Sequence, residues 1–202
     1  EYLVQITRRA LTPPQSNLIP LLMHCVNDAE RIADHTENIL KLTKRLEKSG
    51  IALSDTARHD LDMLWSLLRS QAGNVSLALS GRNMESVSQA LKEERQINKL
   101  TKRYEKNYTR KTDYEAFGHL RSVKISKLAQ KNEQEINLLT REYEKNHIER
   151  RNSGKCTVVA SVIFIEMLSE LERIGDHLAN IAMRAPEIQK HYLALQPDRL
   201  SC

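Results

Sequence analysis

The residues of greatest chemical interest lie in a ten-residue stretch that occurs twice, at residues 30–39 and 172–181. The first copy reads Glu-Arg-Ile-Ala-Asp-His-Thr-Glu-Asn-Ile and the second reads Glu-Arg-Ile-Gly-Asp-His-Leu-Ala-Asn-Ile. Seven of the ten positions are identical, and five of these are polar. Unrelated helices do not usually share so many polar residues in register, so we interpret the two stretches as copies of one functional element.

The acids of each copy are spaced for one face of a helix. Residues four apart lie on the same face, so Glu30 pairs with Asp34, and Glu172 pairs with Asp176. Like charges at this spacing repel each other unless cations lie nearby. The arginine that follows each Glu can supply the positive charge, and so can a metal ion with oxygen ligands. The pattern therefore predicts either a solvated acidic pair or a metal site, and the second copy strengthens the case for metal.

The composition favours helices as the elements that carry these acids. The 202 residues include only 6 Gly and 5 Pro, and Leu, Glu, Lys and Arg are frequent. No apolar run reaches the roughly 18 residues that a membrane span requires. The cysteines at 25, 156 and 202 are too scattered for a zinc site or a disulfide frame, which suits a reducing cytosol. The net charge of +5 is typical of a solvated helical surface and also fits an anionic ligand or membrane.

Turn-forming residues divide the chain into helices with predictable ends. We expect the end of a helix over residues 1–11 stopped by Pro13 and Pro14, a helix capped by Ser16 and ending near 48, a helix over 55–79, and a last long helix from about 156 to 184 closed by Pro186.

The segment 84–151 is dense in charge and contains a second repeat. Nine residues beginning with Glu94 recur 39 positions later, beginning with Glu133, which indicates a duplicated helical piece. A break near Gly118 would give a hairpin, whereas one continuous helix of about 100 Å would protrude or pair with a second chain. A helix that frays in its middle is the third arrangement. We favour a break within 110–120, and the alternating charges argue against a nucleic-acid arm.

With these motifs the chain resembles the PhoU family. Residues 172–176 match the family pattern Glu-Arg-Ile-Gly-Asp fully, and residues 30–34 match it except for Ala33. The resemblance implies an all-α fold of PhoU-like helical bundles with two related three-helix halves. Residues 1–50 would be the end of a truncated first half with the motif helix 16–48. Residues 51–202 would be the second half, with the duplicated segment 84–151 and the motif helix 156–185.

The resemblance also implies a function. The His after each Asp, together with residues 153–156, is most similar to the PhoU-like region that follows the membrane part of bacterial sodium/phosphate cotransporters. We therefore expect a soluble, non-enzymatic regulatory domain of sodium-dependent phosphate transport, in the cytoplasm at the inner membrane. Expected partners are a membrane transporter domain of the same or another chain, phosphate, and a second copy in a homodimer. Nucleic acid is not an expected partner.

The resemblance further implies a metal ion, divalent or trivalent, with iron, zinc and magnesium as candidates. The implied ligands are Glu30, Asp34, Glu172, Asp176, Glu94 and Glu133. At the last two positions the second acid of the family pattern is replaced by Asn98 and Asn137, whose carbonyls bring no charge, so we expect weaker binding there.

Two other functions stay open. A metal-binding enzyme or storage bundle is one, because Glu144 and His147 have the Glu-x-x-His spacing of di-iron bundles. A purely structural oligomerisation domain is the other, and it predicts no metal. No phosphate loop, nucleophile elbow or Cys–His pair indicates catalysis. For His35 and His177 we expect hydrogen bonds on or between helices rather than metal or phosphate contacts.

Overall fold

The computed structural model describes residues 2–7, 10–80, 111–153 and 157–195, with the backbone alone over 111–121. Every element in these ranges is an α-helix, so the predicted all-α fold is confirmed. The helices are α1 (Tyr2–Ile6), α2 (Pro13–Ser49), α3 (Asp55–Ser80), α6 (Lys111–Asn152) and α7 (Val158–Ala194). No described helix is both long and apolar enough to cross a membrane.

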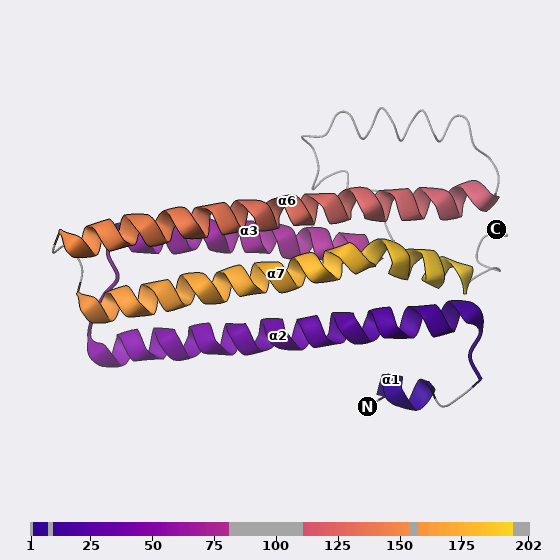
Figure 1. Ribbon diagram of the computed structural model, residues 1–202, viewed down its shortest axis with the longest axis horizontal. Helices are drawn as coiled ribbons and strands as arrows, with labels where there is room; N and C mark the ends of the chain where they lie inside the picture. Colours follow the sequence, from indigo (N-terminus) through magenta and orange to yellow (C-terminus); the bar gives the residue numbers. More distant parts are fainter. Residues whose placement is uncertain (1, 8–9, 81–110, 154–156, 196–202) are drawn as a thin grey trace.

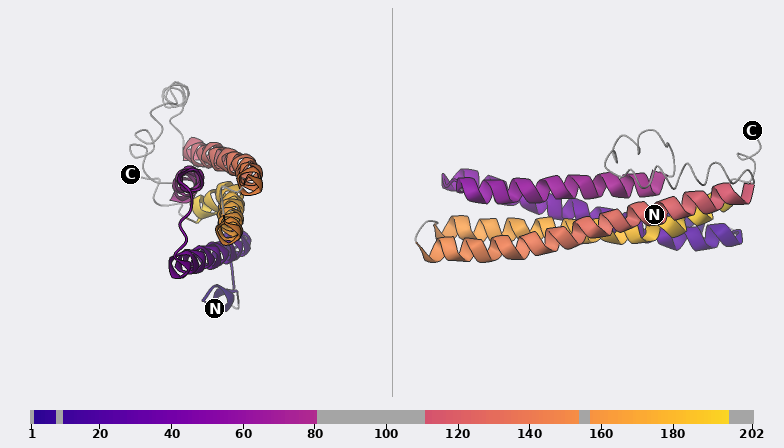
Figure 2. Two further views of the ribbon diagram at one scale, coloured as in Figure 1. Left: turned by 90° about the vertical axis from the view of Figure 1, so that its left-hand side faces the viewer. Right: turned by 90° about the horizontal axis from the view of Figure 1, so that it is seen from above.

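Three of the long helices form a bundle, and the fourth is attached to it. The helices α3, α6 and α7 pack against one another in pairs, and α2 packs mainly along α7. In Figure 1, α2 and α7 run side by side in opposite directions. The end-on view in Figure 2 shows α7 between α6 and α2. The second copy of the repeat therefore lies on the central helix, and the first copy lies on the attached one.

The apolar core belongs to the bundle. It is built from buried side chains of all three bundle helices, among them Leu64, Leu68, Ile136, Phe164 and Leu168. Full burial of each such side chain contributes about 1.5–3 kcal/mol. By contrast, Cys25, Ile32 and Ile39 of α2 are only partly buried against this core. Packing therefore fixes the bundle more firmly than it fixes α2.

The start of α2 corrects one prediction. Thr12, not Ser16, is its N-cap, and the backbone N–H of Thr12 donates to Oε1 of Gln15 over 2.9 Å. Pro13 is the first helical residue, a position where the missing N–H needs no partner. The prolines thus begin a helix rather than end one. The other end was predicted correctly, because Gly50 caps α2 in the left-handed conformation with φ 63°.

The end of α7 corrects a second prediction. The helix does not end near Arg184 but passes through Pro186 to Ala194. The last turns bury Ile188 and Gln189, and Nε2 of Gln189 donates to the carbonyl of Leu79 on α3. This packing offsets the hydrogen bond that a proline removes from a helix.

The charged segment is described in part. The helix α6 begins at Lys111, inside the window where we expect a break, but it runs through Gly118 without interruption. The first copy of the charged repeat, with Glu94, lies outside the described residues.

Candidate functional site

The second copy of the repeat lies where all three bundle helices meet. A Cβ added to Gly175 would lie 3.3 Å from Cδ1 of Ile136 and 3.5 Å from Oε1 of Gln71. Nε2 of Gln71 donates to the carbonyls of Gly175, over 2.9 Å, and Ala129, over 3.2 Å. These two bonds join α3 to both neighbouring helices, and Gln71 is fully buried between them. The glycine of the motif therefore allows a close approach of α6 and α3 to α7.

The two acids of the second copy flank this contact and are poorly compensated. Burial raises the pKa of Glu172, and the carboxylates of Asp176 and Glu144 raise it further, while Arg141 acts in the opposite direction. Burial also raises the pKa of Asp176, although its side chain is exposed, because neighbouring atoms of the bundle remove part of its hydration. Both carboxylates would gain from a nearby positive charge.

Across from these acids, α6 presents oxygen atoms. Ile136 lies against Gly175, and Oγ of Ser126 donates to the carbonyl of Ala182 further along. This antiparallel register puts Glu133 and Asn137 at the same height along the bundle as the two acids of α7.

Two of these oxygen atoms lack hydrogen bonds. The amide of Asn137 donates to Oε1 of Glu133 over 2.5 Å. The other amide atom of Asn137, Oδ1, is buried and accepts no hydrogen bond within the described chain. The same is true of Oγ1 of Thr140, which neither accepts nor donates one there. A buried polar atom without a partner is unfavourable, so these atoms are candidates for a ligand.

The arrangement suits a hard cation bound by few acids. Carboxylate, amide and hydroxyl oxygens are the donors that magnesium and calcium prefer. Within the described ranges, however, no three His, Cys, Asp or Glu side chains lie together as a metal site requires. Two carboxylates alone do not complete such a site, so an ion beside Glu172 and Asp176 would need further oxygen ligands.

The first copy has different surroundings. Glu30, Ala33 and Asp34 are all exposed on α2. The structure does not bring this acid pair together with Glu172 and Asp176, and it does not place the pair between described helices. The two copies are equivalent in sequence but differ in what covers them.

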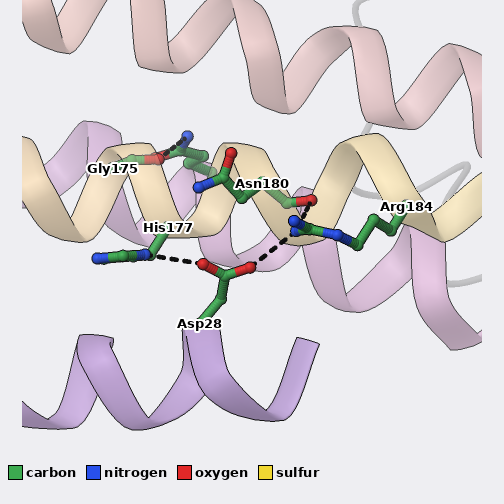
Figure 3. A network of polar contacts seen from close by, with 6 residues as sticks. Asp28, Gly175, His177, Asn180 and Arg184 are labelled. Atoms are coloured by element: carbon green, nitrogen blue, oxygen red, sulfur yellow. Dashed lines mark hydrogen bonds and ion pairs between the residues drawn. The ribbon is translucent and has the colours of Figure 1, made fainter. Parts of the chain in front are cut away.

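The first copy instead contacts the second through other side chains. Asp28 is buried between α2 and α7, where it accepts hydrogen bonds from Nδ1 of His177, over 2.8 Å, and from Nη1 of Arg184, over 2.7 Å (Figure 3). Nδ1 of His35 donates to Oε2 of Glu170 over 2.6 Å. The expectation that both histidines form hydrogen bonds between helices is confirmed.

Sequence reasoning missed Asp28 and Glu170. Each lies two residues before a copy of the repeat, at equivalent positions. Extending the comparison of the copies by two residues toward the N-terminus would have revealed an acid at the same position in both. A count of identical residues does not detect it, because the acid is Asp in one copy and Glu in the other.

The Glu-x-x-His pair of α6 has a structural role. His147 is 1% exposed, and its Nε2 lies 2.9 Å from Oγ of Ser161 on α7. Burial lowers the pKa of His147, and Arg150 lowers it further. His147 thus belongs to a buried contact at one end of the bundle, away from Glu172 and Asp176.

Comparison with known proteins gives one finding. A family model of the PhoU domain matches residues 114–185, a range that includes most of α6 and all of the second copy on α7. Comparisons with curated proteins and with solved structures gave no match.

Proposed function

We propose that this chain, whose residues 114–185 match a family model of the PhoU domain, is a non-catalytic regulatory module of phosphate homeostasis that acts on sodium-dependent phosphate transport. The observation that carries this proposal is the complete motif, residues 172–176, held against α6 within the matched range. Its partner in this role is a membrane transporter domain, of the same or another chain, at the cytoplasmic side of the inner membrane.

The proposed signal is a cation at the second copy. Glu172 and Asp176 would hold the cation together with the oxygen atoms of Asn137 and Thr140 on α6. Glu133, which accepts a hydrogen bond from Asn137, would be a further acid of α6 near this site. When bound, the ion supplies positive charge that balances the two acids and that can attract an anion such as phosphate. The residues themselves then need only orient oxygen atoms, which requires no catalytic group.

The open face of α2 supports a second helical unit. Val26 and Leu40 are 56% and 52% exposed, whereas Leu168 and Ala182, at the equivalent positions of α7, are fully buried by α3 and α6. We infer that α2 is the last helix of a related unit, whose other helices cover this face as α3 and α6 cover α7. In that unit Glu30 and Asp34 would lie in a groove like that of the second copy.

The cation proposal is tested by thermal unfolding with magnesium, manganese, zinc or ferrous ions. An ion that binds the folded chain raises its melting temperature. We expect this increase in the unaltered chain, and we expect Glu172→Gln with Asp176→Asn to abolish it. The matched control is Glu30→Gln with Asp34→Asn in the first copy, which should keep it. An equal increase in melting temperature for all three proteins would show that the ion does not bind at the second copy.

The regulatory proposal is tested in the native host. Sodium-dependent phosphate uptake is measured with and without the gene, and with the two double variants. Uptake that stays the same in the absence of the chain would contradict a role in transport.

The exposed apolar residues of α2 also favour oligomerisation as a second candidate. In that case Val26 and Leu40 contact a second copy of the chain. Light scattering after size exclusion distinguishes the two, because Val26→Glu with Leu40→Glu then converts a dimer into a monomer. The di-iron enzyme or storage candidate gains no support in the described chain, where His147 is engaged with Ser161.

A further inference from the structure

The contact between α2 and α7 is made by the same pair of residue types on both helices. Asp28 and His35 of α2 are seven residues apart, and so are Glu170 and His177 of α7. Seven residues are close to two helical turns, so the acid and the His of each helix lie on the same face. Each helix thus carries an acid followed by a His at a fixed spacing.

The antiparallel packing makes this pattern complementary to itself. The acid of each helix lies opposite the His of the other, as the two short contacts show: 2.8 Å for Asp28 with His177 and 2.6 Å for Glu170 with His35. The imidazole rings of His35 and His177 stack on each other, with their centroids 5.5 Å apart and an angle of 22° between their planes. Side chains on a helix lean toward its N-terminus, which brings both histidines toward the centre of the contact.

Further hydrogen bonds complete both acids. Arg184 donates to the second oxygen of Asp28, and Nδ2 of Asn38 donates to Glu170 over 3.3 Å. The acids and histidines of both pairs are at least three-quarters buried. Charge-assisted bonds of this kind are short and directional.

We propose that these two acid–histidine pairs form a register lock, which selects the antiparallel position of α2 on α7. Of the residues of α2, all of them described, only Leu18, Ile19 and Asp28 are buried, so apolar packing alone restrains this helix weakly. Apolar side chains tolerate sliding along a neighbouring helix, whereas a shift by one turn breaks both pairs together and leaves two acids without partners. The lock is therefore a specificity device between the α2 unit and the bundle.

Reversal of one pair tests the lock in the full chain. The variants are His35→Glu, Glu170→His, and both together, and hydrogen exchange is followed by mass spectrometry on α2 peptides. Each single variant places like groups opposite each other, so we expect α2 amides to exchange about 10- to 100-fold faster, as loss of one or two charge-assisted bonds predicts. The double variant should return to within about threefold of the unaltered chain, because the pair is restored with its direction reversed.

A matched control lies on the same interface. Arg45 and Glu166 form an exposed pair between α2 and α7, 3.7 Å apart. Its reversal, Arg45→Glu with Glu166→Arg, and each single change should alter exchange by less than about threefold. Protection of α3 and α6 peptides shows that the bundle is intact.

If Glu170→His disturbs the bundle itself, Asp28→Asn provides the second test, because it alters only α2 and cuts the other pair. It should accelerate exchange in α2 alone. The proposal is wrong if His35→Glu and Asp28→Asn both leave α2 protected, or if the double reversal exchanges as fast as the single variants.

Discussion

At the scale of single residues, the glycine of the second copy distinguishes it from the first. Gly175 faces Ile136 and Gln71 at contact distance, whereas the equivalent Ala33 is exposed. We expect Gly175→Val to lower the free energy of unfolding by about 2–3 kcal/mol, because the added carbons overpack a fully formed contact. Ala33→Val should lower it by less than about 1 kcal/mol. Urea denaturation of both variants checks this, and equal losses would contradict the asymmetry of the two copies.

The acids of the second copy lead to a prediction with a defined sign. Burial raises the pKa of Glu172 and Asp176 above their ordinary values of 4.5 and 3.8. An acid with a raised pKa in the folded state binds its proton more tightly there, so it stabilises the fold at low pH. That contribution is lost as the pH rises through the raised pKa.

We therefore expect Glu172→Gln and Asp176→Asn to stabilise the chain at pH 7. Both acids are largely hydrated, which limits the gain to a few tenths of a kcal/mol. The gain should vanish as the pH falls below about 3, where the acids are protonated in both states. Urea denaturation at the two pH values measures it, and a variant that is less stable at pH 7 would show that these carboxylates are already compensated.

The acid-bearing faces of the two motif helices could be predicted from the sequence, but the side chains that surround them could not. The spacing of Glu172 and Asp176 was enough to identify an acid-bearing face, since i and i+4 always lie together on a helix. The exposure of Glu30 and Asp34 could not be predicted in this way, because it depends on which helices cover α2. Asp28 was missed because its role arises only when His177 approaches from another helix.

At the scale of helices, a buried ion pair joins the start of α3 to the end of α6. Asp60 of α3 accepts from Nη2 of Arg150 of α6 over 3.3 Å, and the two side chains are 9% and 19% exposed. We expect Arg150→Ala to cost about 2–4 kcal/mol, since it leaves a buried carboxylate without its partner. Thermal or urea unfolding measures the loss.

An exposed pair on the same helix serves as the control for this prediction. Arg58 lies over Asp55 at the start of α3 and is 61% exposed, so Arg58→Ala should cost less than about 0.5 kcal/mol. Replacing both members of the buried pair, Asp60→Asn with Arg150→Ala, should recover part of the loss. No recovery would mean that Arg150 acts through its contact with Phe164 instead.

Helix ends were predictable wherever local chemistry decides them. Gly50 ends α2 through its positive φ, and Oγ of Ser54 accepts from the N–H of Ala57 at the start of α3. Predictions failed at Pro13 and Pro186. A proline ends a helix only if no cap or packing compensates, and here Thr12 supplies the first and the burial of Ile188 the second.

At the scale of the whole molecule, the described chain consists of a firmly packed bundle and one helix, α2, that adds two acid–histidine pairs and a smaller apolar contact. The main apolar core lies in α3, α6 and α7, and the family match covers most of the last two. The helix α2 contacts α7 through the two acid–histidine pairs and leaves Val26 and Leu40 exposed. The boundary near residue 50 stays a prediction, and we propose that the two parts belong to two related units.

The division predicts that residues 51–202 fold without α2. The main core cluster lies in this segment, so separating it from residues 1–50 costs the partial burial of Cys25, Ile32 and Ile39, the burial of Leu18 and Ile19, and the two acid–histidine pairs. We expect a cooperative urea transition with helical circular dichroism, at a midpoint lower than that of the full chain. The face of α7 released by α2 contains Ile174 and Ile181, so the segment should also self-associate with rising concentration.

The reciprocal segment, residues 1–50, serves as the control. It retains α2 but loses the surface on which α2 packs, and an isolated amphipathic helix gains most of its stability from such packing. We expect weak helicity without a cooperative transition, measured by circular dichroism during heating. If residues 51–202 instead unfold without cooperativity while the full chain does not, α2 is an integral part of the core, and the chain is one unit that cannot be divided near residue 50.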